Sequence, residues 1–268
     1  MTRAFLLLAL GTLTMLTGCG GGGKEADPSA TTLTVAATAV PHAEILDAVK
    51  GQLAKDGVTL EVRVFNDYVQ PNVQVAERNI DVNYFQTEPY LKEFNAARGT
   101  KLETIAAIHV EPFAAYSRRW KTLAAIPDKA DVVIPNDGSN AGRALLLLQK
   151  VGLIRLRPEA GALGTVRDIV ANPRHLAIRE LEAATLPRVL GEVDLALINT
   201  NYALDAGLNP VRDALFIEDR DTPYANYVVG LPGAKDDPRV KKLVAALTSP
   251  AARSFIDQRY KGAVIPAF

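Results

Sequence analysis

The sequence predicts an α/β protein whose mostly parallel sheets are covered by helices on both faces. Short runs rich in β-branched residues alternate with longer segments whose apolar residues recur at helical spacing. The alternation continues through both halves of the chain, and no internal repeat interrupts it. Such alternation is typical of parallel sheets with helices packed on each side.

In the first half, strands are expected over residues 33–37, 58–64, 81–85 and 101–110. Helices are expected after Pro41, from Pro71 to about Arg78 and from Pro89 to Arg98. The first of these helices carries Ile45, Leu46, Val49 and Leu53 on one face and ends before Gly57, and Gly99 closes the third.

In the second half, the same criteria predict strands over residues 131–134, 175–178, 194–198, 215–217 and 227–231. The expected helices cover residues 143–151, 166–170, 202–206, 238–247 and 251–260. Asp237 and Ser249 are the expected N-caps of the last two helices.

The first 18 residues are typical of a signal peptide. Arg3 supplies a positive charge, and residues 5–16 are apolar but too few to span a membrane. The segment ends in Leu16-Thr17-Gly18-Cys19, which resembles the lipobox of bacterial lipoproteins. We therefore expect residues 1–18 to be cleaved and Cys19 to carry a lipid anchor; the alternative is a plain signal peptide with an incidental cysteine. Residues 19–32, rich in glycine and polar residues, are expected to be a flexible tether.

Composition excludes several classes of function. Basic and acidic residues are equal in number, 30 of each, so no basic surface points to nucleic acid. A single cysteine excludes an internal disulfide and a cysteine-based zinc cluster. His42, His109 and His175 are scattered along the chain, which argues against a histidine-rich metal site. We expect neither a metal nor a cofactor.

The segment from Asp131 to Gly152 predicts a strand, a loop of turn-forming residues and an apolar helix. Ligands of open α/β sheets bind where such helices begin, beside the carboxyl ends of the strands. Free N–H groups there favour an anion, and Arg143 adds a fork of donors suited to a carboxylate. The alternative is an ordinary strand–helix connection with a surface arginine.

Polar and aromatic residues are concentrated in loops that flank other predicted strand ends. These loops comprise residues 66–68, 84–90, 199–202 and 222–227. They could converge on one cleft with Arg143. Taken one at a time, their asparagines are more typical of turns and caps, and their aromatic residues of the core.

These motifs together resemble the NlpA/MetQ family of methionine-binding lipoproteins, the substrate-binding components of methionine ABC importers. The resemblance covers residues 33–268 and rests on motifs that include Pro41-His42-Ala43-Glu44, Phe85-Gln86, Pro89-Tyr90, His109-Val110-Glu111-Pro112, Gly142-Arg143-Ala144, Asn199-Thr200-Asn201-Tyr202, Pro223-Tyr224-Ala225-Asn226 and Lys261-Gly262-Ala263-Val264. It implies a two-lobed periplasmic-binding-protein fold of type II, with the ligand in a cleft between lobes of residues 33–113 plus 224–268 and residues 114–223.

The resemblance also implies roles for individual residues. Arg143 would bind the α-carboxylate of methionine, Asn201 and Asn226 would accept from its ammonium group, and Tyr68 and Phe85 would wall its side chain. The implied partners are an ABC permease with its ATPase in the inner membrane, and the folded part would lie in the periplasm or outside the cell.

Thr87 departs from the family pattern, in which a histidine follows Phe-Gln. A smaller side chain there alters the wall of the side-chain pocket. Another amino acid or a methionyl dipeptide is therefore an alternative ligand, and a further alternative is an envelope lipoprotein that acts through its surface. An enzyme is not expected, because the chain has no Gly-x-Ser-x-Gly or HExxH motif and His109 with Glu111 lacks a third catalytic partner.

Overall fold

The computed structural model describes residues 31–220 and 222–268. The predicted signal peptide, Cys19 and nearly all of the predicted tether lie outside this part of the chain. Within it, no helix is both long and apolar enough to cross a membrane.

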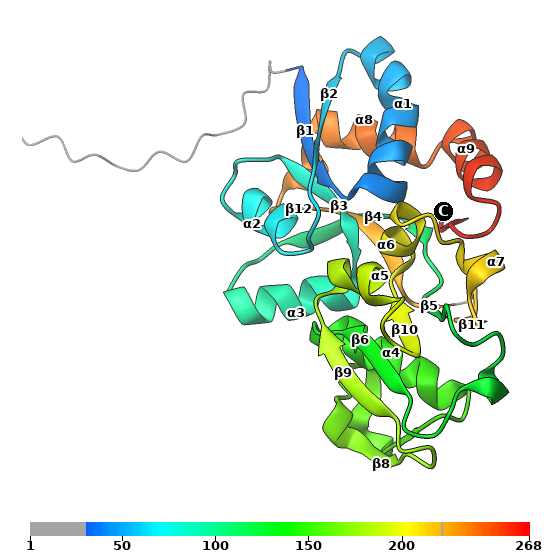
Figure 1. Ribbon diagram of the computed structural model, residues 1–268. Coiled ribbons are helices and arrows are strands. Elements are labelled where there is room, and N and C mark those ends of the chain that lie inside the picture. Colours follow the sequence, from blue (N-terminus) through cyan, green and yellow to red (C-terminus); the bar gives the residue numbers. More distant parts are fainter. Residues whose placement is uncertain (1–30, 221) are drawn as a thin grey trace, which may run out of the picture.

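The described residues form two large sheets, which lie one above the other in Figure 1, and one small ribbon. The upper sheet has the strand order β13-β4-β12-β3-β1-β2 and contains β1 (Thr32–Ala37), β2 (Thr59–Val64), β3 (Val82–Thr87), β4 (Glu103–Val110), β12 (Ala225–Gly230) and β13 (Ile265–Pro266). The lower sheet has the order β11-β5-β10-β6-β9 and contains β5 (Ala114–Tyr116), β6 (Asp131–Pro135), β9 (Ala177–Leu181), β10 (Leu195–Ile198) and β11 (Phe216–Ile217). A small antiparallel ribbon joins β7 (Arg155–Leu156) to β8 (Ile169–Ala171).

Helices cover both faces of each sheet. On the upper sheet, α1 (Glu44–Lys55), α8 (Pro238–Leu247) and α9 (Pro250–Tyr260) pack on one face, and α2 (Gln70–Ala76) and α3 (Glu88–Arg98) on the other. On the lower sheet, α4 (Gly138–Lys150) faces α5 (Leu186–Val189) and α6 (Thr200–Asp205) across the strands, and α7 (Pro210–Asp213) follows α6. The predicted two-lobed α/β fold is confirmed.

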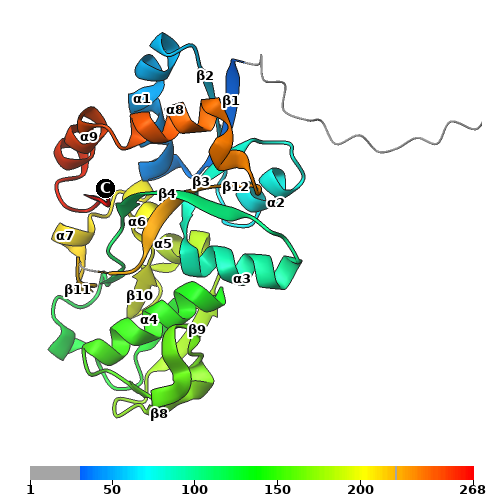
Figure 2. The same ribbon diagram turned by 180° about the vertical axis from the view of Figure 1, so that it is seen from behind.

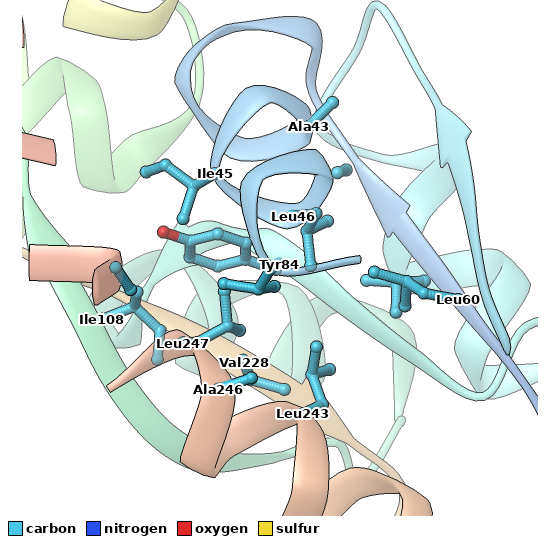
Figure 3. Close-up of a cluster of buried hydrophobic side chains, with 14 of the residues drawn as sticks. Ala43, Ile45, Leu46, Leu60, Tyr84, Ile108, Val228, Leu243, Ala246 and Leu247 are labelled. Carbon is cyan, nitrogen blue, oxygen red and sulfur yellow. The ribbon is translucent and has the colours of Figure 1, made fainter. Parts of the chain in front are cut away.

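The alternation of side chains along each strand explains why both faces need a helical cover. In β1, Leu33 and Val35 join the cluster beneath α1 and α8, whereas Ala36 joins the cluster beneath α2 and α3. Figure 3 shows part of the first cluster, where Leu46 of α1 and Leu247 of α8 gather around the strands. Both leucines are fully buried, and burial of such a side chain stabilises the fold by about 1.5–3 kcal/mol.

The sheets are mixed, which corrects the expectation of mostly parallel sheets. In the upper sheet β1 pairs in parallel with β2 and β3, but β12 runs antiparallel to both β3 and β4. In the lower sheet β10 is parallel to β6 and antiparallel to β5. The chain enters the lower lobe once and returns once, so a late strand, β12, is inserted between two early ones; strand–helix alternation does not reveal this direction.

Two predicted helices differ from the structure. α4 begins at Gly138 rather than at Arg143, because the Asp137 side chain caps it by accepting from the Asn140 amide at 2.9 Å. Residues 166–170 form a short 3₁₀ turn followed by β8 instead of a helix. The remaining predicted helices are present, with ends shifted by up to a few residues.

Candidate ligand-binding cleft

A cavity of about 360 Å³, including space open to solvent, lies between the two lobes. Every residue predicted to bind the ligand lines it, and the full lining is Tyr68, Phe85, Gln86, Thr87, Tyr90, Glu111, Asn140, Arg143, Asn199, Thr200, Asn201 and Asn226. The structure thus brings residues from distant parts of the chain to one place.

The cavity lies at the carboxyl ends of strands from both lobes. Phe85 and Thr87 belong to the end of β3, where α3 begins, and Asn226 lies opposite Thr87 on β12. From the other lobe, Arg143 comes from the second turn of α4 after β6, and Asn201 from the first turn of α6 after β10. This is the position at which open α/β sheets bind ligands.

Aromatic rings form one wall of the cavity. The Tyr68 ring lies 5.8 Å from Phe85 and 5.7 Å from Tyr90, measured between centroids. The Tyr90 hydroxyl donates to the Tyr68 carbonyl at 2.9 Å, which fixes the two residues relative to each other. The Tyr68 hydroxyl donates across the cleft to Asn201 Oδ1 at 2.6 Å, so this wall is also a contact between the lobes.

Arg143 is buried and already has protein partners. Its Nη2 donates to the Glu111 carbonyl at 2.8 Å, and the guanidinium forms an ion pair with Glu218. The ring of Tyr224 lies 4.1 Å from the guanidinium carbon and the ring of Phe113 lies 5.3 Å from it. Its partners come from the two segments that connect the lobes, whereas the sequence had suggested a free fork of donors.

Two of the three histidines meet in the fold, contrary to their scattered positions in the sequence. His109 Nε2 lies 2.7 Å from Glu111 Oε1 and His42 Nε2 lies 3.4 Å from the same oxygen. The other ring nitrogens are also occupied, by the Thr38 hydroxyl at 2.7 Å from His42 Nδ1 and by the Tyr84 hydroxyl at His109 Nδ1. Because every ring nitrogen has a partner among the described residues, this cluster is satisfied as a hydrogen-bond network.

Burial controls the charges of this cluster. Desolvation lowers the pKa of His42 to about 4 and that of His109 to about 3, so both rings are neutral near pH 7. Desolvation also raises the pKa of Glu111, opposed by His42, Arg143 and the backbone amide of Asn201. Glu111 therefore places an acidic group at the boundary between the cavity and the histidines.

The amide side chains of the cavity are held differently from one another. His42 Nε2 lies 3.2 Å from Asn226 Oδ1, so the neutral ring with its proton on Nε2 can donate to it. Asn199 Nδ2 donates to Asn140 Oδ1 at 2.8 Å, but the buried Oδ1 of Asn199 has no partner among the described residues. An unpaired buried acceptor is costly, so this oxygen is available to a ligand donor.

Sequence reasoning did not single out several residues of the lining. Glu111, Tyr90 and Asn199 each lay in motifs that were noted, but nothing in their spacing showed which side chains turn into the cleft. Glu111 could have been found by charge, because a cleft for a zwitterion needs a negative group as well as Arg143.

Comparison with known proteins places the chain in a family. The family model for NlpA lipoprotein matches residues 33–268. A protein of Escherichia coli (strain K12) named D-methionine-binding lipoprotein MetQ is 41% identical over 254 residues, covering 93% of this chain and 92% of that protein.

Solved structures agree with this match. A nutrient binding protein from Burkholderia cenocepacia bound to methionine superposes with a TM-score of 0.86 at 43% identity, covering 88% of this chain and 100% of that one. Lipoprotein Tp32 from Treponema pallidum superposes with a TM-score of 0.85 at 39% identity, covering 88% and 99%. With the family model matched over all but the N-terminal segment, the chain belongs to the NlpA lipoprotein family.

Proposed function

We propose that this chain is the lipid-anchored substrate-binding component of an ABC importer and that it captures methionine between its lobes. The observation that carries the proposal is the cavity in which Arg143, asparagine amides and aromatic rings from both lobes meet. Relatives named for methionine binding and a methionine-bound structural neighbour support this choice of ligand.

Arg143 is the proposed partner of the ligand carboxylate. Its Nε and Nη2 are engaged by Glu218 and the Glu111 carbonyl, and no hydrogen bond to Nη1 is found within residues 31–220 and 222–268. Nη1 can therefore donate to a carboxylate while the other two nitrogens hold the guanidinium in place. A carboxylate in a closed cleft needs such a charged donor, because an unpaired buried charge is prohibitively costly.

Asn201 and Asn226 are the proposed acceptors for the ligand ammonium. Each Oδ1 has one protein partner, Tyr68 or His42, and an amide oxygen has two lone pairs. The unpaired Oδ1 of Asn199 and the carboxylate of Glu111 supply further acceptors in the same lining. A zwitterion thus finds opposite charges for both of its groups.

The methionine side chain is proposed to lie against Tyr68 and Phe85. A thioether is polarizable and gains about 0.3–1.5 kcal/mol from each contact with an aromatic edge. Thr87 lines the same cavity beside these rings and leaves more room than a larger residue would. We propose that methionine binding persists with Thr87 in place, at reduced affinity.

The lobe boundaries, the lipid anchor and the transport partners are part of the same proposal. The sheet memberships support a first lobe of residues 33–113 plus 224–268 and a second lobe of residues 114–223. Cys19 would anchor the folded part to a bacterial membrane through the tether, and a permease with its ATPase would receive the ligand. We also propose that the chain binds its ligand without turnover.

Isothermal titration calorimetry with L-methionine, D-methionine, methionyl dipeptides and other amino acids tests the proposal. We expect saturable binding of methionine, one ligand per chain, and full recovery of the ligand afterwards. Stronger binding of a methionyl dipeptide would make Thr87 a specificity choice for a longer ligand. No binding of any of these compounds would favour a lipoprotein that acts through its surface, and consumption of the ligand would favour an enzyme.

A further inference from the structure

α3 of the first lobe and α4 of the second lobe lie side by side, as Figure 2 shows from the back of the molecule. Glu93, on α3, reaches the first turn of α4. Its Oε1 accepts from the Gly138 amide at 2.9 Å and its Oε2 accepts from the Ser139 amide at 2.7 Å. A carboxylate of one lobe therefore caps a helix of the other.

The first turn of α4 depends on this contact. The first N–H groups of a helix have no partner within the helix itself. The Asp137 side chain accepts from the Asn140 amide, and the Asp137 carbonyl accepts from the Ala141 amide at 2.8 Å. The Gly138 and Ser139 amides are left for Glu93, whose negative charge also suits the positive end of the helix dipole.

Gly138 gives the carboxylate room to approach. A Cβ at this position would lie 2.8 Å from Glu93 Oε1, which is closer than a real Cβ comes. A methyl group at this position would therefore push the flexible end of the Glu93 side chain away from its present place.

The Glu93 contact holds a helix that lines the cavity, although Glu93 itself does not line it. α4 carries Asn140 and Arg143, which line the cavity, whereas Glu93 does not line it. Separation of the lobes would return the Gly138 and Ser139 amides and the Glu93 carboxylate to water. The contact can thus exist only while α3 and α4 lie together.

We propose that Glu93 is a positioning residue that latches the closed cleft by capping α4, and so tightens ligand binding without touching the ligand. The inference rests on the proposed function, because it concerns closure around the ligand. Tyr68 and Asn201 also bond across the cleft, but both line the cavity. The Tyr202 hydroxyl donates to the Asn66 carbonyl at 3.2 Å outside the lining. Among the described residues, Glu93 therefore makes one of two such contacts across the cleft, and the one whose acceptor is a side chain that substitution can remove.

The test measures Kd and the dissociation rate of L-methionine for the full chain and its variants. Glu93→Ala should raise Kd about five- to thirtyfold, mainly through faster dissociation, and Glu93→Gln, which keeps one acceptor, should raise it less. Glu103→Ala, which removes an exposed carboxylate at the first residue of β4, the end of the strand away from the cavity-lining Glu111, is the control and should keep the wild-type Kd.

Gly138→Ala makes the test specific to the latch. Its methyl group should shift the Glu93 carboxylate and raise Kd by no more than Glu93→Ala does, and it should change nothing further in the Glu93→Ala background, where the obstructing atoms are gone. A merely structural role for either residue would give additive losses.

The outcomes separate this inference from the proposed function. Glu93→Ala with a Kd within twofold of the wild type would overturn the latch while leaving methionine binding intact. Additive effects of the two substitutions would also overturn it. A wild-type chain that binds no amino acid would instead contradict the proposed function.

Discussion

Arg143 and Glu218 form a bidentate ion pair: Arg143 Nε donates to Glu218 Oε1 at 3.1 Å and Nη2 donates to Oε2. Glu218 lies at the start of the segment that returns the chain to the first lobe, and Nη2 also bonds the Glu111 carbonyl in the outgoing segment. The residue proposed to bind the ligand carboxylate thus also ties together the two connections between the lobes.

Arg143→Ala should therefore affect both binding and stability. Loss of the carboxylate donor should weaken methionine binding by more than about thirtyfold, corresponding to roughly 2–5 kcal/mol for a buried charge left unpaired. The ligand-free chain should also melt at a lower temperature, because Glu218 and the Glu111 carbonyl lose their donor. Calorimetry and thermal unfolding measure the two effects.

Arg179→Ala is the matched control for this variant. Arg179 pairs with Asp131 at 2.7 Å in the same lobe, but its side chain is 52% exposed. Solvent screens an exposed pair, so both affinity and melting temperature should change little. Near-normal affinity of Arg143→Ala would place the carboxylate site elsewhere.

Thr87→His should tighten methionine binding by about three- to thirtyfold, equivalent to roughly 0.7–2 kcal/mol. An imidazole fills space beside the ligand side chain that threonine leaves open, and an unfilled void of about 50 Å³ costs about 1 kcal/mol. The affinity for methionine measured by calorimetry checks this expectation. Abolished binding of the preferred ligand in Thr87→His would show that methionine is the wrong substrate.

His109 should make the protein less stable in acid. Burial lowers its pKa to about 3, so below pH 6.5 the unfolded chain takes up a proton that native His109 refuses. The unfolded state then binds more protons, and the free energy of unfolding falls as the pH falls from about 6.5 toward 3, at up to about 1.4 kcal/mol per pH unit. His42 acts in the same direction between about 6.5 and 4.

The raised pKa values of Glu111 and Asp137 make the free energy of unfolding rise as the pH falls, which opposes the effect of the histidines. The test therefore compares the free energy of unfolding of a variant with that of the wild type at each pH. His109→Gln removes the titrating ring, and its stability deficit relative to the wild type should shrink by on the order of 2 kcal/mol between pH 7 and pH 4.5. Urea unfolding at each pH measures it, with the exposed His175→Gln as the control. A deficit that is constant over this range would contradict a buried neutral His109.

Cys19→Ala should abolish lipid incorporation and leave the precursor uncleaved or mislocalised. Stable anchoring takes two acyl chains or equivalent signals, so the wild type should stay in the membrane fraction at high salt. Labelled fatty acid incorporation and fractionation check this. Release of the wild type by salt alone would exclude the anchor.

Much of the fold followed from local chemistry. Pro89 near its start and Gly99 after its last residue bound α3, and Ser249 followed by Pro250 starts α9, because caps and backbone preferences act within a few residues. Apolar periodicity likewise located most strands. Whole-chain resemblance added the two lobes and a set of site residues, all of which line one cavity in the structure.

Other features were decided only when distant segments packed together. Gly142 lies in the interior of α4, where the backbone of Ala162 leaves no space for a side chain: a Cβ at Gly142 would lie 2.2 Å from the Ala162 carbonyl oxygen. No local pattern predicts this contact. Arg143 pairs with Glu218 of the segment that returns to the first lobe. Because β12 returns into the first sheet, its Asn226 lies within hydrogen-bonding distance of His42, which is 184 residues away in the sequence.

The sequence by itself therefore determined most of the elements, because helix caps and strand periodicity are local properties, and the order of motifs along the whole chain indicated the residue types of the cleft. The tertiary structure alone decided strand direction, the partners of buried charges and the Glu93 contact with Gly138 and Ser139. Those features depend on which groups lose water together, and burial is a property of the packed chain rather than of any segment.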